Sequence, residues 1–103
     1  MRKFHVEITR KAESDITSIF EYILRDDINA AGRWIEEIER QIGSLEIFPT
    51  RSPVIPETKE LGQEYRHLIY GNYRTIFRIQ GSKVIILRVF HGARLLGLDG
   101  VRE

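Results

Sequence analysis

The sequence contains no cysteine and no long hydrophobic run. The absence of cysteine excludes disulfide bonds and the usual zinc clusters. No stretch approaches the roughly 20 apolar residues that a membrane-spanning helix needs. The residues that follow Met1 alternate between polar and apolar, which is not the pattern of a secretory signal. We therefore expect a cytoplasmic protein with no membrane partner.

The positions of the three histidines do not suggest a metal site. His5, His67 and His91 are neither clustered nor spaced along one helix face, so we expect no metal site and no cofactor. The length of 103 residues, with 42% hydrophobic and 30% charged residues, is ordinary for a soluble globular protein. These values predict a single domain spanning residues 1–103.

The net charge of +1 is divided unevenly along the chain. Residues 1–62 carry 9 Lys/Arg and 12 Asp/Glu, whereas residues 63–103 carry 7 Lys/Arg and 3 Asp/Glu. The C-terminal part is therefore basic, and an anionic partner is expected to bind there. The alternative is a chance asymmetry, which is common at this size.

The N-terminal part of the chain predicts a strand followed by a helix. Phe4, Val6 and Ile8 alternate with polar residues and indicate a half-buried strand over residues 3–8. Thr9 is the expected N-cap of an amphipathic helix that ends near Arg25.

A second helix is predicted to begin after Asn29, its candidate N-cap, and to stop before Pro49. Its apolar residues fall in one stripe, which consists of Ala31, Trp34, Ile35, Ile38, Ile42 and Leu45. Because the break between the two helices is short, they must pack antiparallel as a hairpin, with their apolar stripes on a sheet. Residues 49–63 contain all three prolines and predict an irregular connection.

Residues 65–94 predict three strands joined by two-residue turns at Gly71-Asn72 and Gly81-Ser82. Period-two alternation then places Ile76 opposite Leu87 and Arg74 opposite Val89. One face of the sheet would carry Tyr65, His67, Ile69, Arg74, Ile76, Arg78, Ile85, Leu87, Val89 and His91. The other would carry Arg66, Leu68, Tyr70, Tyr73, Thr75, Phe77, Ile79, Val84, Ile86, Arg88 and Phe90.

The second of these faces is the better surface for the helices, because Leu68, Phe77, Ile79, Val84, Ile86 and Phe90 lie on it. The predicted fold is therefore α+β. It consists of an N-terminal strand, an antiparallel helix hairpin and a three-stranded antiparallel meander, with the helices packed on one face of the sheet.

This order of elements resembles the RelE/ParE superfamily of toxins from bacterial type II toxin-antitoxin modules. Three segments carry the resemblance, which covers nearly the whole chain. They are YRHLIYGNYRTIFRI at residues 65–79, RVFHGAR at residues 88–94, and the helix pattern A-x-x-D-I-x-x-I-x-x-Y-I that begins at Ala12. The resemblance implies a growth-inhibiting toxin that a cognate antitoxin protein neutralises.

The two branches of the superfamily imply different targets. RelE-like members cut messenger RNA on the ribosome, using lysines on the first meander strand, arginines on the second strand and near the chain end, and a C-terminal tyrosine. Arg74 and Arg94 match the arginines, but Tyr65 and His67 stand at the lysine positions, and no tyrosine follows Tyr73. The match to the nucleases is therefore partial.

A metal-independent endoribonuclease would place Arg74 and Arg94 on phosphate and use His91 as acid or base, since imidazole suits proton transfer near neutral pH. The alternative for His91 is a structural role at a strand end. The ending RVFHGAR is similar to that of ParE-like and plasmid-stabilisation members, which implies binding to DNA gyrase without chemistry. Messenger RNA cleavage on the ribosome, and antitoxin binding without toxicity, stay open as alternatives.

The face opposite the helices would expose a larger apolar and basic surface than a monomer usually does. We expect an amphipathic, acidic antitoxin segment, or the target, to cover it. The candidate binding residues are Tyr65, His67, Ile69, Arg74, Ile76, Arg78, Ile85, Leu87 and Val89. The alternative is that Leu95, Leu96 and Leu98 of the C-terminal segment fold back over this face.

Overall fold

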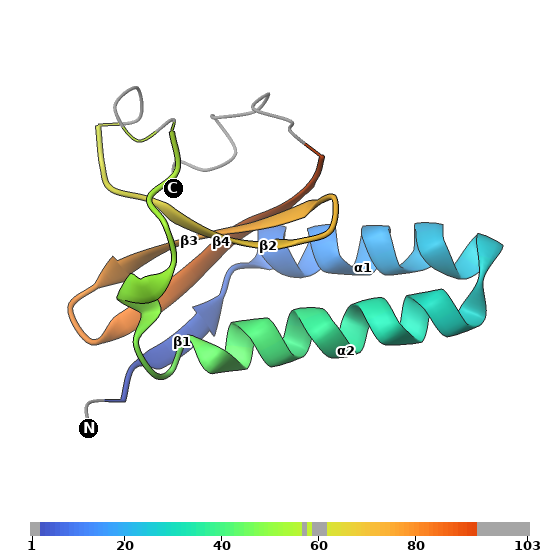
Figure 1. The fold of residues 1–103 in the computed structure, drawn as a ribbon, viewed down its shortest axis with the longest axis horizontal. Coiled ribbons are helices and arrows are strands. Elements are labelled where there is room, and N and C mark those ends of the chain that lie inside the picture. The colour runs from blue at the N-terminus through green and yellow to red at the C-terminus, as the bar shows by residue number, and fades with distance from the viewer. Residues whose placement is uncertain (1–2, 57, 59–61, 93–103) are drawn as a thin grey trace.

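The structure is a computed structural model that describes residues 3–56, 58 and 62–92. Its elements follow the predicted order (Figure 1). Strand β1 spans His5–Ile8, and helices α1 and α2 span Arg10–Asp26 and Ile28–Ser44. A short 3-10 helix, η1, covers Pro49–Arg51, and strands β2, β3 and β4 span Arg66–Tyr70, Tyr73–Gln80 and Lys83–His91. The predicted α+β fold is confirmed.

The helix N-termini are closed by side-chain caps. The Oγ1 atom of Thr9 accepts a hydrogen bond from the backbone N–H of Ala12 at 3.2 Å, which confirms Thr9 as the cap of α1. The prediction of Asn29 as the second cap is wrong. Asp27 is the single residue between the helices, and its Oδ1 accepts from the N–H of Ala30 at 3.1 Å. The chain therefore reverses direction more sharply than expected.

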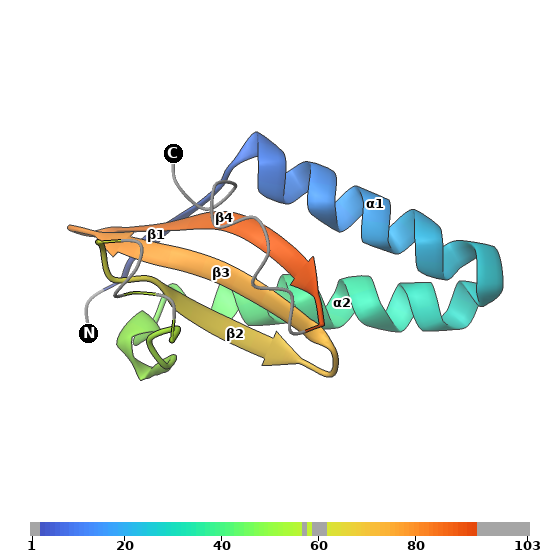
Figure 2. The ribbon, with the colours of Figure 1, turned by 90° about the horizontal axis from the view of Figure 1, so that it is seen from above.

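The four strands form one sheet in the order β1-β4-β3-β2 (Figure 2). Both predicted turns are confirmed, because Tyr70 pairs with Tyr73 and Gln80 pairs with Lys83. The sheet as a whole is mixed and not purely antiparallel, since β1 runs parallel to β4. The chain between β1 and β4 contains both helices and the strands β2 and β3. It is therefore long enough to bring β1 and β4 together as a parallel pair.

A bulge in β4 changes the predicted faces of the last strand. Ile76 pairs with Arg88, whereas the next residue, Phe77, pairs with Ile86, so that Leu87 is an extra residue in β4. The predicted pairs of Ile76 with Leu87 and of Arg74 with Val89 are therefore wrong. The extra residue reverses the alternation of every side chain that follows it.

The helices pack on one side of the sheet, here named the helix face. The buried residues of this main core are Ala12, Trp34, Ile38, Ile42, Leu45, Phe77, Val84, Ile86 and Val89. Val89 belongs to this core because of the bulge, and not to the opposite side as predicted. Trp34, Ile38 and Ile42 are spaced four residues apart on α2, so they share the face directed at the sheet.

A second, smaller core lies on the other side of the sheet, here named the outer face. Its buried residues are Ile55, Tyr65, Ile76 and Leu87, with Ile85 and Phe90 packed against them. The prediction of Phe90 on the helix face is therefore wrong, because the bulge at Leu87 reverses its side. Ile55 comes from the connection at residues 49–63, and its N–H donates to the carbonyl oxygen of Tyr65 at 2.9 Å. The connection therefore covers part of the face that was expected to await a partner.

The helix hairpin extends well past the end of the sheet, as both views show (Figures 1 and 2). Among the described residues, no strand lies against the last turns of α1 or the first turns of α2. In the described part of the chain, neither helix combines the length and the apolar character that crossing a membrane requires.

Candidate functional site

The predicted partner-binding residues divide into covered and accessible groups. Tyr65, Ile76 and Leu87 are each at most 3% exposed, because they form the small core beneath Ile55. Ile69 on the edge strand β2 is 57% exposed, and Ile85 is half-buried. The accessible part of the outer face is thus centred on β2 and β3, and it is narrower than the predicted surface.

Arg74 and His67 form a hydrogen-bonded pair within this outer face. The Nε of Arg74 donates to Nδ1 of His67 at 3.2 Å, and Arg74 is 9% exposed. A guanidinium has only donors, so Nδ1 of His67 is the acceptor in this contact. His67 therefore orients Arg74, while Arg78 lies half-buried on the same face.

Of the residues predicted for RNA cleavage, the two that the structure describes, Arg74 and His91, lie on opposite faces of the sheet. Arg74 lies on the outer face with His67, whereas His91 pairs with Tyr73 and lies on the helix face. The prediction that His91 shares a face with Arg74 is wrong because of the bulge at Leu87. Arg94 lies outside the described residues. General acid-base catalysis needs its groups within hydrogen-bond reach of one substrate, and a sheet separates these two.

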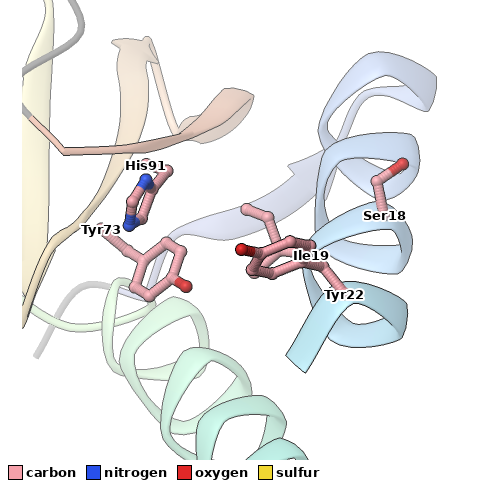
Figure 3. A pocket seen from close by; sticks show the side chains of 5 residues that line it. All are labelled: Ser18, Ile19, Tyr22, Tyr73 and His91. Atoms are coloured by element: carbon pink, nitrogen blue, oxygen red, sulfur yellow. The ribbon is translucent and has the colours of Figure 1, made fainter. Parts of the chain in front are cut away.

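His91 instead lines a pocket of about 260 Å³ at the end of the sheet. The other lining residues are Ser18, Ile19 and Tyr22 of α1 and Tyr73 of β3. Tyr22 and Tyr73 project toward each other from the two elements, with His91 beside Tyr73 (Figure 3). The pocket therefore combines two phenols and an imidazole with an apolar wall.

Tyr73 is held in this pocket by two aromatic neighbours. Its ring centroid lies 4.9 Å from that of His91 and 5.4 Å from that of Trp34, which packs edge-on. Burial raises the pKa of the Tyr73 phenol above its ordinary value, and the nearby phenol of Tyr22 adds to this shift. Tyr73 is therefore a neutral hydrogen-bonding group at physiological pH.

This pocket was not predicted from the sequence. Tyr73 lies on the helix face as expected, whereas His91 was expected on the opposite face and Tyr22 was given no role. One signal was present in the sequence, since Tyr22 is a large aromatic residue outside the apolar stripe predicted for its helix. Among the described residues, no group of three or more His, Asp or Glu side chains is arranged to hold a metal ion.

Comparison with known proteins identifies the family. The family profile described as "ParE toxin of type II toxin-antitoxin system, parDE" matches residues 6–96. The chain belongs to the ParE toxin family. Curated protein sequences contain no significant match.

Two solved structures are similar to this ParE-type toxin along most of its length. A chain of the chromosomal ParDE toxin-antitoxin system from P. aeruginosa is 20% identical with a TM-score of 0.70, and the match covers 87% of this chain and 97% of that one. A chain of the toxin-antitoxin complex RelBE2 from Mycobacterium tuberculosis is 25% identical with a TM-score of 0.58, covering 90% and 95%. The superfamily expected from the sequence is therefore confirmed.

Proposed function

We propose that this ParE-type toxin inhibits growth by binding a protein of DNA replication, DNA gyrase, and that it catalyses no reaction. The observation that supports this proposal is the separation of Arg74 and His91 on opposite faces of the sheet. A nuclease would need both groups at one phosphodiester. Membership in the ParE family points in the same direction.

The proposal includes a cognate antitoxin, since the similar structures are toxin-antitoxin systems. We place the antitoxin on the accessible part of the outer face, around Ile69. The described cations on this face are those of Arg74 and Arg78 on β3. An acidic antitoxin segment with apolar residues would complement both the charge and the exposed isoleucine.

Expression of the toxin from a tightly controlled promoter would test the target. DNA breakage with intact messenger RNA is the result expected of gyrase binding. Codon-phased cleavage of messenger RNA would instead indicate ribosome-dependent RNA cleavage. That cleavage should then be lost in Arg74→Ala and kept in the control Arg33→Ala, because Arg33 is an exposed residue of α2. An absence of growth arrest would indicate a chain that binds its partner without toxicity.

A separate experiment tests the antitoxin surface. Ile69→Glu places a negative charge at the centre of the proposed surface and is expected to weaken antitoxin binding by about tenfold or more. Ile28→Glu is a matched control, because Ile28 is 73% exposed at the far tip of the hairpin. Equal affinity of the two variants in titration calorimetry would place the antitoxin elsewhere.

A further inference from the structure

A second surface lies where the helix hairpin extends past the sheet (Figure 2). Tyr22 and Ile28 are 71% and 73% exposed there. Single large hydrophobic side chains are common on protein surfaces, but Tyr22 also lines two hollows. The surface around Tyr22 is therefore concave as well as apolar.

The two hollows differ in chemistry. The first is the pocket of Ser18, Ile19, Tyr73 and His91 described above (Figure 3). The second, of about 430 Å³, is lined by Ile23, Arg25, Asp26, Asp27 and Ala30 beside Tyr22. Because Tyr22 lines both, the two hollows lie next to each other, with the aromatic one at the sheet and the charged one at the helix turn. We name the two hollows together the Tyr22 groove.

The charged end of the Tyr22 groove is negative. It contains the carboxylates of Asp26 and Asp27 and the guanidinium of Arg25. One carboxylate oxygen of Asp27 is already used to cap α2. Within the part of the chain that the structure describes, Asp26 forms no ion pair within 4.0 Å. Asp26 is therefore the carboxylate in this end that has both oxygens available to a cation.

We propose that the Tyr22 groove binds a protein segment that carries an aromatic side chain and, one helical turn away, a lysine or arginine. The aromatic pocket is smaller than the roughly 300 Å³ at which small-molecule sites begin, and it suits a single ring. The phenols of Tyr22 and Tyr73 offer hydrogen bonds to an indole N–H or a phenol. The basic residue pairs with Asp26.

The spacing of the segment follows from the helix. Tyr22 and Asp26 are four residues apart on α1, which separates them by about 6 Å along the helix axis. Residues four apart on a bound helix have the same separation, so an aromatic residue and a basic residue at that spacing can reach both ends. The charge required of this partner is opposite to that proposed for the antitoxin, so the inference does not depend on the proposed function.

A model peptide tests the inference. We would titrate the full chain, labelled with nitrogen-15, with an alanine-rich helical peptide of roughly 16 residues that carries tryptophan and, four residues on, lysine. Saturable shifts of the Ser18, Tyr22 and Tyr73 amide signals are expected. A peptide with glutamate for lysine should bind about fivefold or more weakly, and one with alanine for tryptophan about tenfold or more weakly.

Variants of the chain make the test specific. Tyr22→Ala should abolish the tryptophan preference, and Asp26→Lys should reverse the preference from the lysine peptide to the glutamate peptide. Val54→Ala is the matched control, because it shortens an exposed apolar side chain in the connection between α2 and β2 and should change nothing. The far-ultraviolet circular dichroism of each variant checks its fold.

Three results would overturn the inference. One is equal binding of all three peptides, and another is the absence of saturable shifts in the groove. The third is a dependence of the same signals on protein concentration without peptide, which would assign the groove to a second copy of this chain.

Discussion

Arg88 of β4 and Asp15 of α1 form a two-pronged ion pair. The Nε and Nη2 atoms of Arg88 donate to the two carboxylate oxygens of Asp15 at 2.7 and 3.0 Å. The same carboxylate accepts the backbone N–H of Val89 at 2.9 Å. The pairing of β1 with β4 ends at Ile86, so β1 offers no acceptor to the N–H of Val89. Asp15 accepts this N–H in its place. The hydrogen bond to Asp15 raises the pKa of the Arg88 guanidinium above its ordinary value.

Replacement of Asp15 by alanine should lower the free energy of unfolding by about 2 to 3 kcal/mol, because the change leaves a partly buried guanidinium and an N–H without their acceptor. Asp15→Asn should cost less, since an amide oxygen can still accept from Val89. Urea unfolding followed by circular dichroism gives both values. Glu13→Ala, in the exposed first turn of the same helix, is the control, and an equal loss in Glu13→Ala and Asp15→Ala would contradict the role of the pair.

Thr9→Ala is expected to lower the free energy of unfolding by about 1 to 2 kcal/mol. The Thr9 hydroxyl accepts from the N–H of Ala12 and donates to the carbonyl oxygen of Leu87 at 3.1 Å, so it joins the start of α1 to the bulge. Thr17→Ala removes the same hydroxyl from an exposed position on α1 and should have little effect. Thermal unfolding of the two variants compares them directly, and similar midpoints would argue against the cap.

Ile55→Ala should lower the free energy of unfolding by about 2 to 4 kcal/mol, because it removes the side chain that covers the small core of the outer face. Val54→Ala provides a matched control, since Val54 is 40% exposed. Hydrogen exchange should also show faster exchange at Tyr65 in the Ile55 variant. Unchanged stability of Ile55→Ala would mean that the connection does not support this core.

The raised pKa of Tyr73 predicts a stability that falls at high pH. The unfolded phenol ionises near pH 10, whereas the folded phenol holds its proton to a higher pH. The free energy of unfolding contributed by Tyr73 is therefore complete below about pH 10 and is lost as pH rises through the folded pKa. The ultraviolet absorbance of phenolate, measured against pH for the wild type and Tyr73→Phe, isolates this group. A Tyr73 midpoint at or below that of a free phenol would refute the prediction.

Much of the fold was predictable because it depends on local patterns. The Thr9 cap, the helix stripes and the two-residue turns each act over a few residues. Gly71 and Gly81 have φ angles of 57° and 60°, the left-handed values that such hairpin turns need and that glycine adopts without strain. The family resemblance followed from segments in these same elements, and the ParE family match confirmed it.

The sequence by itself therefore determined the order of the elements, the turns of the meander and the superfamily. Only the tertiary structure decided which residues share a site. The bulge at Leu87 carries no local signal such as glycine, yet it moves His91 away from Arg74 and into a pocket with Tyr22 and Tyr73. The same holds for Ile55, whose position over the outer face depends on contacts with strands that follow it in the chain. Strand register and long-range packing depend on contacts between residues that are far apart in the sequence. A short segment of sequence therefore does not reveal them.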